Sequence, residues 1–374
     1  MEDKYGEAGF ETAAPRRARK KRKSVGALIL QDILLTGLIL CVFALFHHVL
    51  PRLTAAQSRT PTPVPVRTAA PLATPDVPPT EQTAAPDGTA EPTPTPEPTP
   101  DPMDWRTIFA EHFTDEVVVT ENSYTSPNVA ITIDRIVTDD EAQITYFVAD
   151  IYIADLQCFA AWWAGGDFRF WMEEESVTMA RDSGAILTIN GDYADNQTAG
   201  GLLVRNGQLY FDDPTGNDIC VLYYDGTMET HEAGTYEVED ILAREPYQIW
   251  KFGPALLDAD GQARERGSFN TTSAIADVNP RSGVGYYEPG HYCFVLVDGR
   301  QPGYSYGARI ERFSQIFAEL GCRCAYNLDG GRSSVLTFNQ SVFNHPYLGG
   351  RPAGDILLIR ELPGTPTTGE EDEP

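Results

Sequence analysis

Hydrophobic and polar residues alternate along the chain from about residue 116, and this pattern predicts β-strands. Apolar and often β-branched residues recur through EVVVTEN (116–122), NVAITIDRIV (128–137) and AQITYFVADIYIADL (142–156). The aromatic run CFAAWWAGGDF (158–168) follows and is expected to pack in the core. The pattern then changes at MEEESVTMARDSG (172–184), which predicts a short helix that ends at a glycine.

Three later apolar segments each end directly on a glycine turn. AILTIN leads into GDY (185–193), HYCFVLV leads into DGR (291–300), and RCAYNL leads into DGGRSS (323–334). Each segment therefore predicts a strand that delivers an Asn or Asp side chain to a turn.

The last two of these strands enclose ARIERFSQIFAELG (308–321), which has the periodicity of an amphipathic helix. The apolar residues on one face of this helix are Ile310, Phe313, Phe317 and Leu320. A strand, a helix and a strand with short connections form a βαβ unit whose strands run parallel. Asp298 and Asp329 are therefore expected to face each other on one rim of the sheet, where ligands commonly bind.

The elements together predict an α/β (α+β) domain with a mixed β-sheet core and flanking helices. Cys322 and Cys324 are expected side by side on one face of the last strand, as a buried thiol pair in preference to a disulfide. The six cysteines match no zinc-binding spacing.

Asp-Gly is a common turn dipeptide, so each strand end has a purely structural interpretation. The turns at 223–227 and 258–261 are expected to be of that kind. Asp298 and Asp329 differ because Arg300 and Arg332 follow them and NPRSG (279–283) lies nearby. Guanidinium groups and free N–H groups at Gly330 and Gly331 suit an anion. The residues alone thus predict a carboxylate and arginine site for a phosphorylated or acidic ligand.

The first hundred residues predict a membrane-targeting segment followed by an extended spacer. A basic stretch (16–23) precedes an apolar segment, 27–50, that spans about 36 Å as a helix, enough to cross a bilayer. The positive flank places residues 1–26 in the cytoplasm and the rest outside the cell membrane, as a single-pass protein. A cleaved signal peptide is the alternative, but the leader is long and no clear cleavage site follows promptly.

Residues 51–103 are rich in Pro and Thr and predict a disordered, extended spacer. The extracytoplasmic domain is expected at 104–364, followed by an acidic tail at 365–374. The formal net charge of the chain is −26, although residues 1–26 contain eight basic and four acidic residues. Such an acidic domain repels phosphate backbones, so nucleic acid is not expected as a partner.

The ordered set of segments resembles the phosphodiester glycosidase family, which includes the enzyme that uncovers mannose 6-phosphate and bacterial envelope-associated relatives. The matching segments run in the family's order from about residue 117 to 360, with a core at about 181–362. They are AILTINGDY, GLLVRNGQLY, YYDGTM, FGPALLDADG, NPRSGVGY, HYCFVLVDGR, GARIERFSQIFAELGC, AYNLDGGRSS and GDILLI. The resemblance implies hydrolysis of the bond between the anomeric carbon of a sugar and a phosphodiester oxygen.

The resemblance also implies a set of site residues. The catalytic candidates are Asp329, Asp298 and Asp192, and the substrate-binding candidates that match the motifs are Asn190, Arg281, Arg300, Asn327, Gly330 and Gly331. Arg332 and Ser333, which follow in the same loop, are further substrate-binding candidates. The arginines and glycine N–H groups would neutralise the departing phosphate, and the carboxylates would stabilise a positively charged anomeric centre and activate water. No cofactor is implied with certainty, and the aspartates also offer oxygen ligands to a divalent cation.

The sequence departs from the family pattern at Arg332, which stands where the third glycine of NLDGGGS is usual. It also has NPRS for the usual NPRT and GDYAD where relatives often continue GDYYG. An arginine at position 332 adds a cation but disfavours positive φ. Three functions follow from these observations. The first is a membrane-anchored hydrolase acting on sugar-1-phosphodiesters in cell-envelope glycans. The alternatives are a non-catalytic domain that binds such glycans and a metal-dependent phosphodiesterase that cuts the P–O bond.

Overall fold

The computed structural model describes residues 62–63, 104–138, 143–193 and 201–362. The predicted cytoplasmic tail, membrane segment 27–50 and acidic tail, and nearly all of the predicted spacer, lie outside these ranges. Within them, none of the helices has the length and apolar character needed to cross a membrane.

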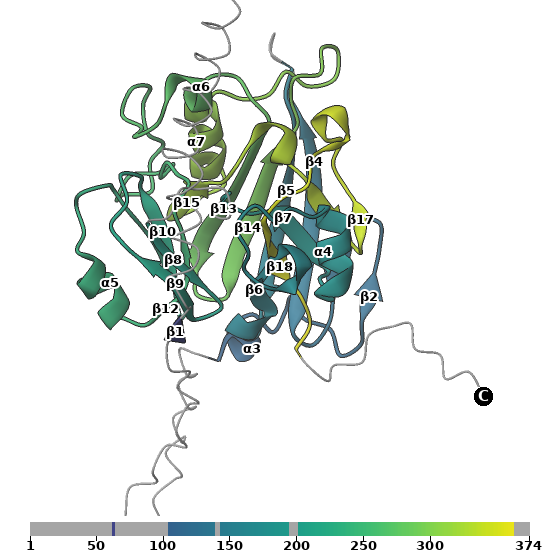
Figure 1. The fold of residues 1–374 in the computed structure, drawn as a ribbon. Helices are drawn as coiled ribbons and strands as arrows, with labels where there is room; N and C mark the ends of the chain where they lie inside the picture. Colours follow the sequence, from purple (N-terminus) through teal and green to yellow (C-terminus); the bar gives the residue numbers. More distant parts are fainter. Residues whose placement is uncertain (1–61, 64–103, 139–142, 194–200, 363–374) are drawn as a thin grey trace, which may run out of the picture. The chain divides into compact units, whose positions relative to one another are not determined.

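The described residues form three β-sheets with a few short helices, which is an α+β fold (Figure 1). The α+β prediction is therefore confirmed, whereas the prediction of a mixed sheet is wrong. Each strand pairing in the described part of the chain is antiparallel.

A seven-stranded sheet carries most of the predicted strands. Its order is β15 (Cys324–Asn327), β13 (Arg281–Glu288), β14 (His291–Val297), β5 (Thr145–Ile153), β4 (Val129–Val137), β3 (Ser123–Thr125) and β2 (Val118–Val119). Strands β14 and β15 both pair antiparallel with β13, so they run parallel to each other with β13 between them. They end at one edge of the sheet as predicted, but they are not neighbours.

Two further sheets complete the fold. The five-stranded sheet has the order β17 (Ser341–Val342), β16 (Leu336–Phe338), β7 (Leu187–Asn190), β18 (Asp355–Ile359) and β6 (Phe159–Trp163). The six-stranded sheet has the order β1 (Thr62–Pro63), β9 (Gln208–Asp212), β8 (Leu202–Arg205), β12 (Pro246–Trp250), β10 (Ile219–Tyr223) and β11 (Met228–His231). One buried apolar cluster contains side chains of all three sheets and forms the central core.

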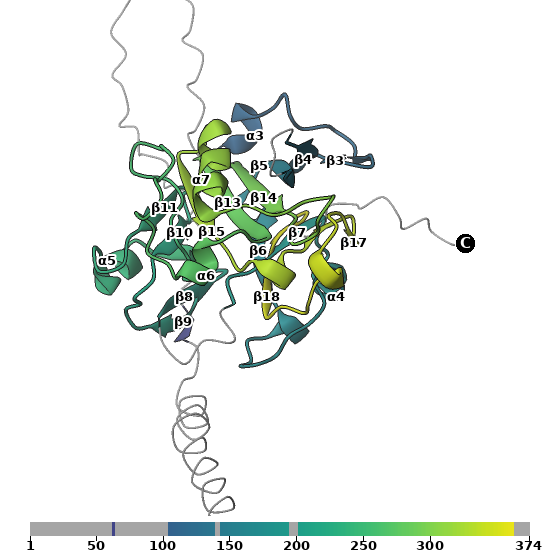
Figure 2. The ribbon, with the colours of Figure 1, turned by 90° about the horizontal axis from the view of Figure 1, so that it is seen from above.

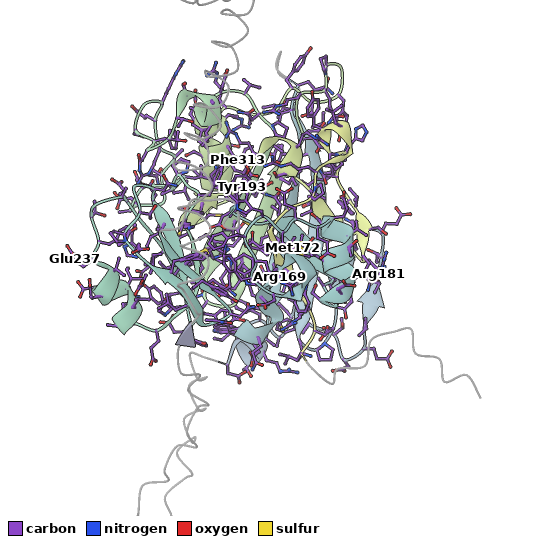
Figure 3. The ribbon with its side chains drawn as sticks, in the orientation of Figure 1. Arg169, Met172, Arg181, Tyr193, Glu237 and Phe313 are labelled. Carbon is purple, nitrogen blue, oxygen red and sulfur yellow. The ribbon has the colours of Figure 1, made fainter. Side chains whose placement is uncertain are left out.

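Five short α-helices accompany the sheets in the described residues. They are α3 (Trp105–Ile108), α4 (Ser176–Asp182), α5 (Val238–Ala243), α6 (Ser273–Ala276) and α7 (Ile310–Glu319). Helix α4 packs on the five-stranded sheet and α5 on the six-stranded sheet, at opposite flanks of the molecule, as Arg181 and Glu237 show in Figure 3. Helix α6 lies beside α7 (Figure 2).

Helix α7 packs closely on β13 because that strand carries glycine at two inward positions. A Cβ atom at Gly283 would lie 2.9 Å from the ring of Phe313, and one at Gly285 would lie 2.8 Å from Phe317. The predicted apolar face of the helix is thus the face that packs on the sheet. Its residues Ile310, Phe313 and Phe317 are buried, and Leu320 is partly buried.

The cysteines are not arranged as the alternation predicted. Strand β15 begins only at Cys324, so Cys322 lies before the strand and the two do not share its face. The Cys322 Sγ atom lies 3.6 Å from Cys293 Sγ in the cluster under α7, while Cys324 belongs to the central core. The five described cysteines are all buried free thiols.

Candidate active site

A cleft of about 160 Å³ opens at the edge where β13 begins and β15 ends. The predicted site residues in its wall are Arg281, Arg300, Asn327, Asp329, Gly330 and Gly331. The other lining residues, which sequence reasoning missed, are Phe252, Ala274, Ile275 and Asn279. The topology brings Arg281 and Asn327 to the same end of the sheet. Arg281 is the first residue of β13, and Asn327 is the last residue of β15, which pairs antiparallel with β13.

Asp329 supplies the carboxylate of the cleft, and its side chain is only 15% exposed. Burial raises the pKa of this carboxyl group above its ordinary value, and the bonds from Ser333 and Arg351 partly oppose that rise. The Ser333 hydroxyl and the Arg351 Nη2 group, at 2.7 Å, both donate to Oδ2. Asp329 also lines a second, smaller cavity of about 10 Å³ together with Tyr193 and Asp355.

Two guanidinium groups line the same cleft as Asp329. Arg281 is 2% exposed, and its Nε and Nη2 groups donate to the carbonyls of Ala308 and Asp277. Burial lowers the pKa of Arg281 to about 10, so it remains charged at neutral pH. Arg300 has a positive φ of 58° and donates to Asn279 Oδ1 at 2.6 Å. Both cations are therefore fixed by neutral oxygen atoms and keep their full charge for an anionic ligand.

The two asparagines have different surroundings. Asn190 joins the sheets, because its Nδ2 donates to the Asp329 carbonyl at 2.8 Å and its Oδ1 accepts from Ser282 at 2.7 Å. Asn327 donates to the Gly253 carbonyl at 2.8 Å, but its Oδ1 is buried and has no partner among the described residues. An unsatisfied buried acceptor in a cleft wall is suited to a hydroxyl or N–H group of a ligand.

The glycine loop does not offer free N–H groups as the sequence suggested. The Gly331 N–H donates to the Pro280 carbonyl at 3.0 Å, and the Gly330 N–H interacts with the Asp329 carboxylate. The glycines are required for space instead. A Cβ atom at Gly330 would lie 2.7 Å from the Pro280 oxygen, and one at Gly331 would lie 3.3 Å from the Arg300 guanidinium.

Asp298 does not face Asp329, contrary to the prediction from the strand ends. Its oxygens accept from Tyr304 at 2.8 Å, from Asn344 at 2.7 Å and from the His345 N–H at 3.0 Å. It is 1% exposed and lines neither cavity that Asp329 lines. Asp298 therefore fixes the loop that carries Arg300.

Asp192 lies in a buried charge cluster beside the site. Arg205 donates to Asp192 and to Asp355, and the Lys251 N–H donates to the second oxygen of Asp192. The three side chains of this cluster, Arg205, Asp192 and Asp355, are at most 1% exposed. The guanidinium occupies the space between the two carboxylates, where a cation would otherwise be expected. Across the described ranges, no group of three or more His, Cys, Asp or Glu side chains is arranged to hold a metal ion.

Arg332 does not line the cleft, although its position in the glycine loop suggested it. It lies in the 3₁₀ turn Gly331–Ser333 and is not among the described non-glycine residues with positive φ. Its Nη2 group donates to the Gly350 carbonyl at 2.8 Å. The arginine therefore fits the turn without backbone strain and points to a neighbouring loop.

Arg351, which sequence reasoning missed, is the cation in contact with Asp329. Arg351 follows a Gly-Gly pair, as Arg332 does. This repeated Gly-Gly-Arg sequence was the only feature that could have pointed to Arg351. Nothing in the local pattern indicates that the two loops meet.

Comparison with known proteins identifies the fold and the family of this region. Residues 183–360 match the model of the family NAGPA: Phosphodiester glycosidase, which confirms the resemblance seen in the sequence for that part of the chain. The catalytic domain of zebrafish N-acetylglucosamine-1-phosphodiester alpha-N-acetylglucosaminidase, auto-inhibited by its pro-peptide, has a similar fold with a TM-score of 0.54. The two are 19% identical, and the match covers 66% of this chain and 88% of the zebrafish chain.

A curated bacterial relative is similar over the same length of chain. The SPbeta prophage-derived uncharacterized protein YomE of Bacillus subtilis (strain 168) is 29% identical over 178 residues, which is 46% of this chain. The match spans 27% of YomE, so about three quarters of that protein have no counterpart in it.

Proposed function

We propose that the chain hydrolyses the glycosidic bond of sugar-1-phosphodiesters, on the premise that residues 183–360 match the phosphodiester glycosidase family. The observation that carries the proposal is the composition of one cleft. It combines a mostly buried carboxylate, Asp329, with two fixed guanidinium groups, Arg281 and Arg300. A sugar-1-phosphodiester presents the matching charges, since its phosphate is anionic and its anomeric carbon becomes positive as the bond breaks.

The guanidinium groups stabilise the leaving phosphate in this mechanism. Negative charge accumulates on the bridging oxygen as the bond to the sugar lengthens, and preorganised cations lower the energy of that state. A phosphate monoester leaves without a strong acid to protonate it. The site accordingly needs no second carboxylate as general acid, which agrees with the positions of Asp298 and Asp192 outside the cleft.

Asp329 acts on the sugar side of the bond. As a carboxylate it stabilises the positive anomeric centre, and it accepts the proton of the attacking water. Its raised pKa makes it a better base than an exposed aspartate. The unpaired Asn327 Oδ1 accepts a hydrogen bond from a sugar hydroxyl or amide in the same cleft.

We extend the proposal to the setting of the protein. The basic stretch and the apolar segment 27–50 support a single-pass membrane anchor with the domain outside, and the Pro/Thr-rich stretch supports a spacer. A domain held near the membrane surface would reach cell-envelope glycans that contain sugar-phosphate diesters.

The proposal is tested by incubating the purified full-length protein with a sugar-1-phosphodiester and measuring the released sugar and phosphomonoester. The Asp329→Asn variant is expected to lose about 10²- to 10⁴-fold in rate, because it loses the charge and the base. Asp260→Asn is the matched control, since Asp260 also precedes a glycine but is exposed on a distant turn. No release by the wild type, or equal rates in wild type and Asp329→Asn, would refute the assignment.

A further inference from the structure

The chain makes a sharp corner at Leu348–Gly350 immediately before Arg351. The three corner residues have positive φ angles of 52°, 76° and 87°. This conformation is unfavourable for leucine, and Leu348 is 70% exposed, so burial of its side chain does not offset the strain. A strained backbone persists only where its surroundings hold it, and such positions cluster at functional sites.

Arg332 provides one of the contacts that hold the corner. Its Nη2 group donates to the Gly350 carbonyl at 2.8 Å, and a Cβ atom added at Gly350 would lie 2.9 Å from the Val335 side chain. The loop that follows Asp329 is thereby tied to the loop that precedes Arg351.

Arg351, Ser333 and Asp329 form a closed set of hydrogen bonds. Arg351 donates to Asp329 Oδ2 through Nη2 and to Ser333 Oγ through Nε, both at 2.7 Å. The Ser333 hydroxyl, which accepts from the arginine, donates its own proton to the same Oδ2. The Arg351 guanidinium also lies 5.2 Å from the centre of the Tyr193 ring. The arginine thus contacts Asp329, Ser333 and Tyr193, and both donors hold the same carboxylate oxygen of Asp329.

We propose that Arg351 is a positioning residue that orients the Asp329 carboxylate, and that Arg332 acts through Arg351 by fixing the corner before it. The consequence for catalysis rests on the proposed function, but the positioning itself does not. In this chain Arg332 thereby stabilises the loop that precedes Arg351.

The charged and titratable groups around Asp329 determine what removal of Arg351 does. Arg281 and Arg300 line the cleft, while Tyr193 and Asp355 line the small cavity. Burial raises the pKa of Asp329, and Arg351 opposes the rise through its charge and its hydrogen bond. Loss of Arg351 therefore leaves a mostly buried carboxyl group without its nearest cation, and the pKa of Asp329 is expected to rise further.

The test is a carbon NMR titration of Asp329 in full-length protein labelled at the aspartate carboxyl carbon, assigned with Asp329→Asn. Arg351→Gln is expected to raise the pKa of Asp329 by about 1 unit or more. Arg332→Gly is expected to raise it by less, and to add nothing in the Arg351→Gln background. Arg244→Gln is the matched control, because it breaks a distant Arg–Glu229 pair and is expected to leave Asp329 unchanged.

Two results would overturn the inference: an unchanged Asp329 titration in Arg351→Gln, or an Arg332→Gly shift of equal size in both backgrounds. If Arg351→Gln does not fold, Arg351→Lys serves instead, since it keeps the charge but lacks the forked donor. An upward shift is expected there too, and an unchanged titration contradicts the proposal. The titration uses no substrate, so its outcome is independent of whether the protein hydrolyses a sugar-1-phosphodiester.

Discussion

The three predicted catalytic aspartates differ in the groups that surround their carboxylates. Asp192 is neutralised by Arg205, and Asp298 accepts from three donors that organise a loop. Asp329 alone among the three lines the cleft with the guanidinium groups. A glycine next to an aspartate indicates a turn but does not show which groups surround the carboxylate, and those groups come from distant parts of the chain.

The buried charge cluster gives a prediction for stability against pH. Burial, and then the charge of Asp192, raise the pKa of Asp355 to about 6, against the effect of Arg205. Because the pKa of Asp355 is higher in the native state than in the unfolded state, the native state binds the proton more tightly. Protonation of Asp355 therefore stabilises the native state fully below about pH 4, and this stabilisation is lost as the pH rises through about 6.

Asp355→Asn removes this titration, so its free energy of unfolding should change less between pH 4 and pH 6 than that of the wild type. The expected difference between the two changes is about 1 to 3 kcal/mol, measured by urea unfolding at each pH. Parallel curves for the two proteins would show that Asp355 does not titrate in this range.

At the scale of elements, the sequence predicted individual strands and helices better than it predicted which strands are neighbours in a sheet. The alternation in 128–137 and the face of 308–321 depend on local periodicity, and β4 and α7 appear where expected. The insertion of β13 between β14 and β15 depends on contacts far apart in the chain. The Gly-rich composition of β13 also hid it, since glycine weakens the strand pattern.

The close packing of α7 on β13 predicts a cost for any side chain at Gly285. A Cβ atom there would lie 2.7 Å from Cys293 Sγ and 2.8 Å from Cys322 Sγ, so Gly285→Ala forces the helix or the strand to shift. The expected loss is about 1 to 3 kcal/mol in the free energy of unfolding. Gly216→Ala is the control, because nothing lies within 4 Å of its Cβ position. Equal stability of the two variants would contradict this packing.

At the scale of the whole molecule, the structure explains how the site residues come together, whereas the membrane anchor and the spacer remain predictions. Three sheets share one core and bring the strand ends and loops together around Asp329. The family pattern predicted most of the cleft wall, whereas Arg351, which contacts Asp329, comes from a loop with no periodic signal. The anchor and spacer lie outside the described residues and depend on composition alone.

The predicted anchor is tested by membrane fractionation. Full-length protein is expected to stay with the membrane after an alkaline wash, with its N-terminus intact by mass spectrometry. Leu38→Arg combined with Val42→Arg should release it, since each central arginine costs about 2.5 to 3.5 kcal/mol on insertion. A mature N-terminus beyond residue 50 would instead establish a cleaved signal peptide.

Hydrolysis in water labelled with heavy oxygen tests the central claim most directly, because it shows which bond of a sugar-1-phosphodiester is cut. Attack at the anomeric carbon places the label in the released sugar and none in the phosphomonoester, and this is the result that the cleft predicts. Asp329→Asn should give no labelled sugar above background over the same period. Label in the phosphate would contradict the account, since it would mean that the protein cuts the P–O bond as a phosphodiesterase.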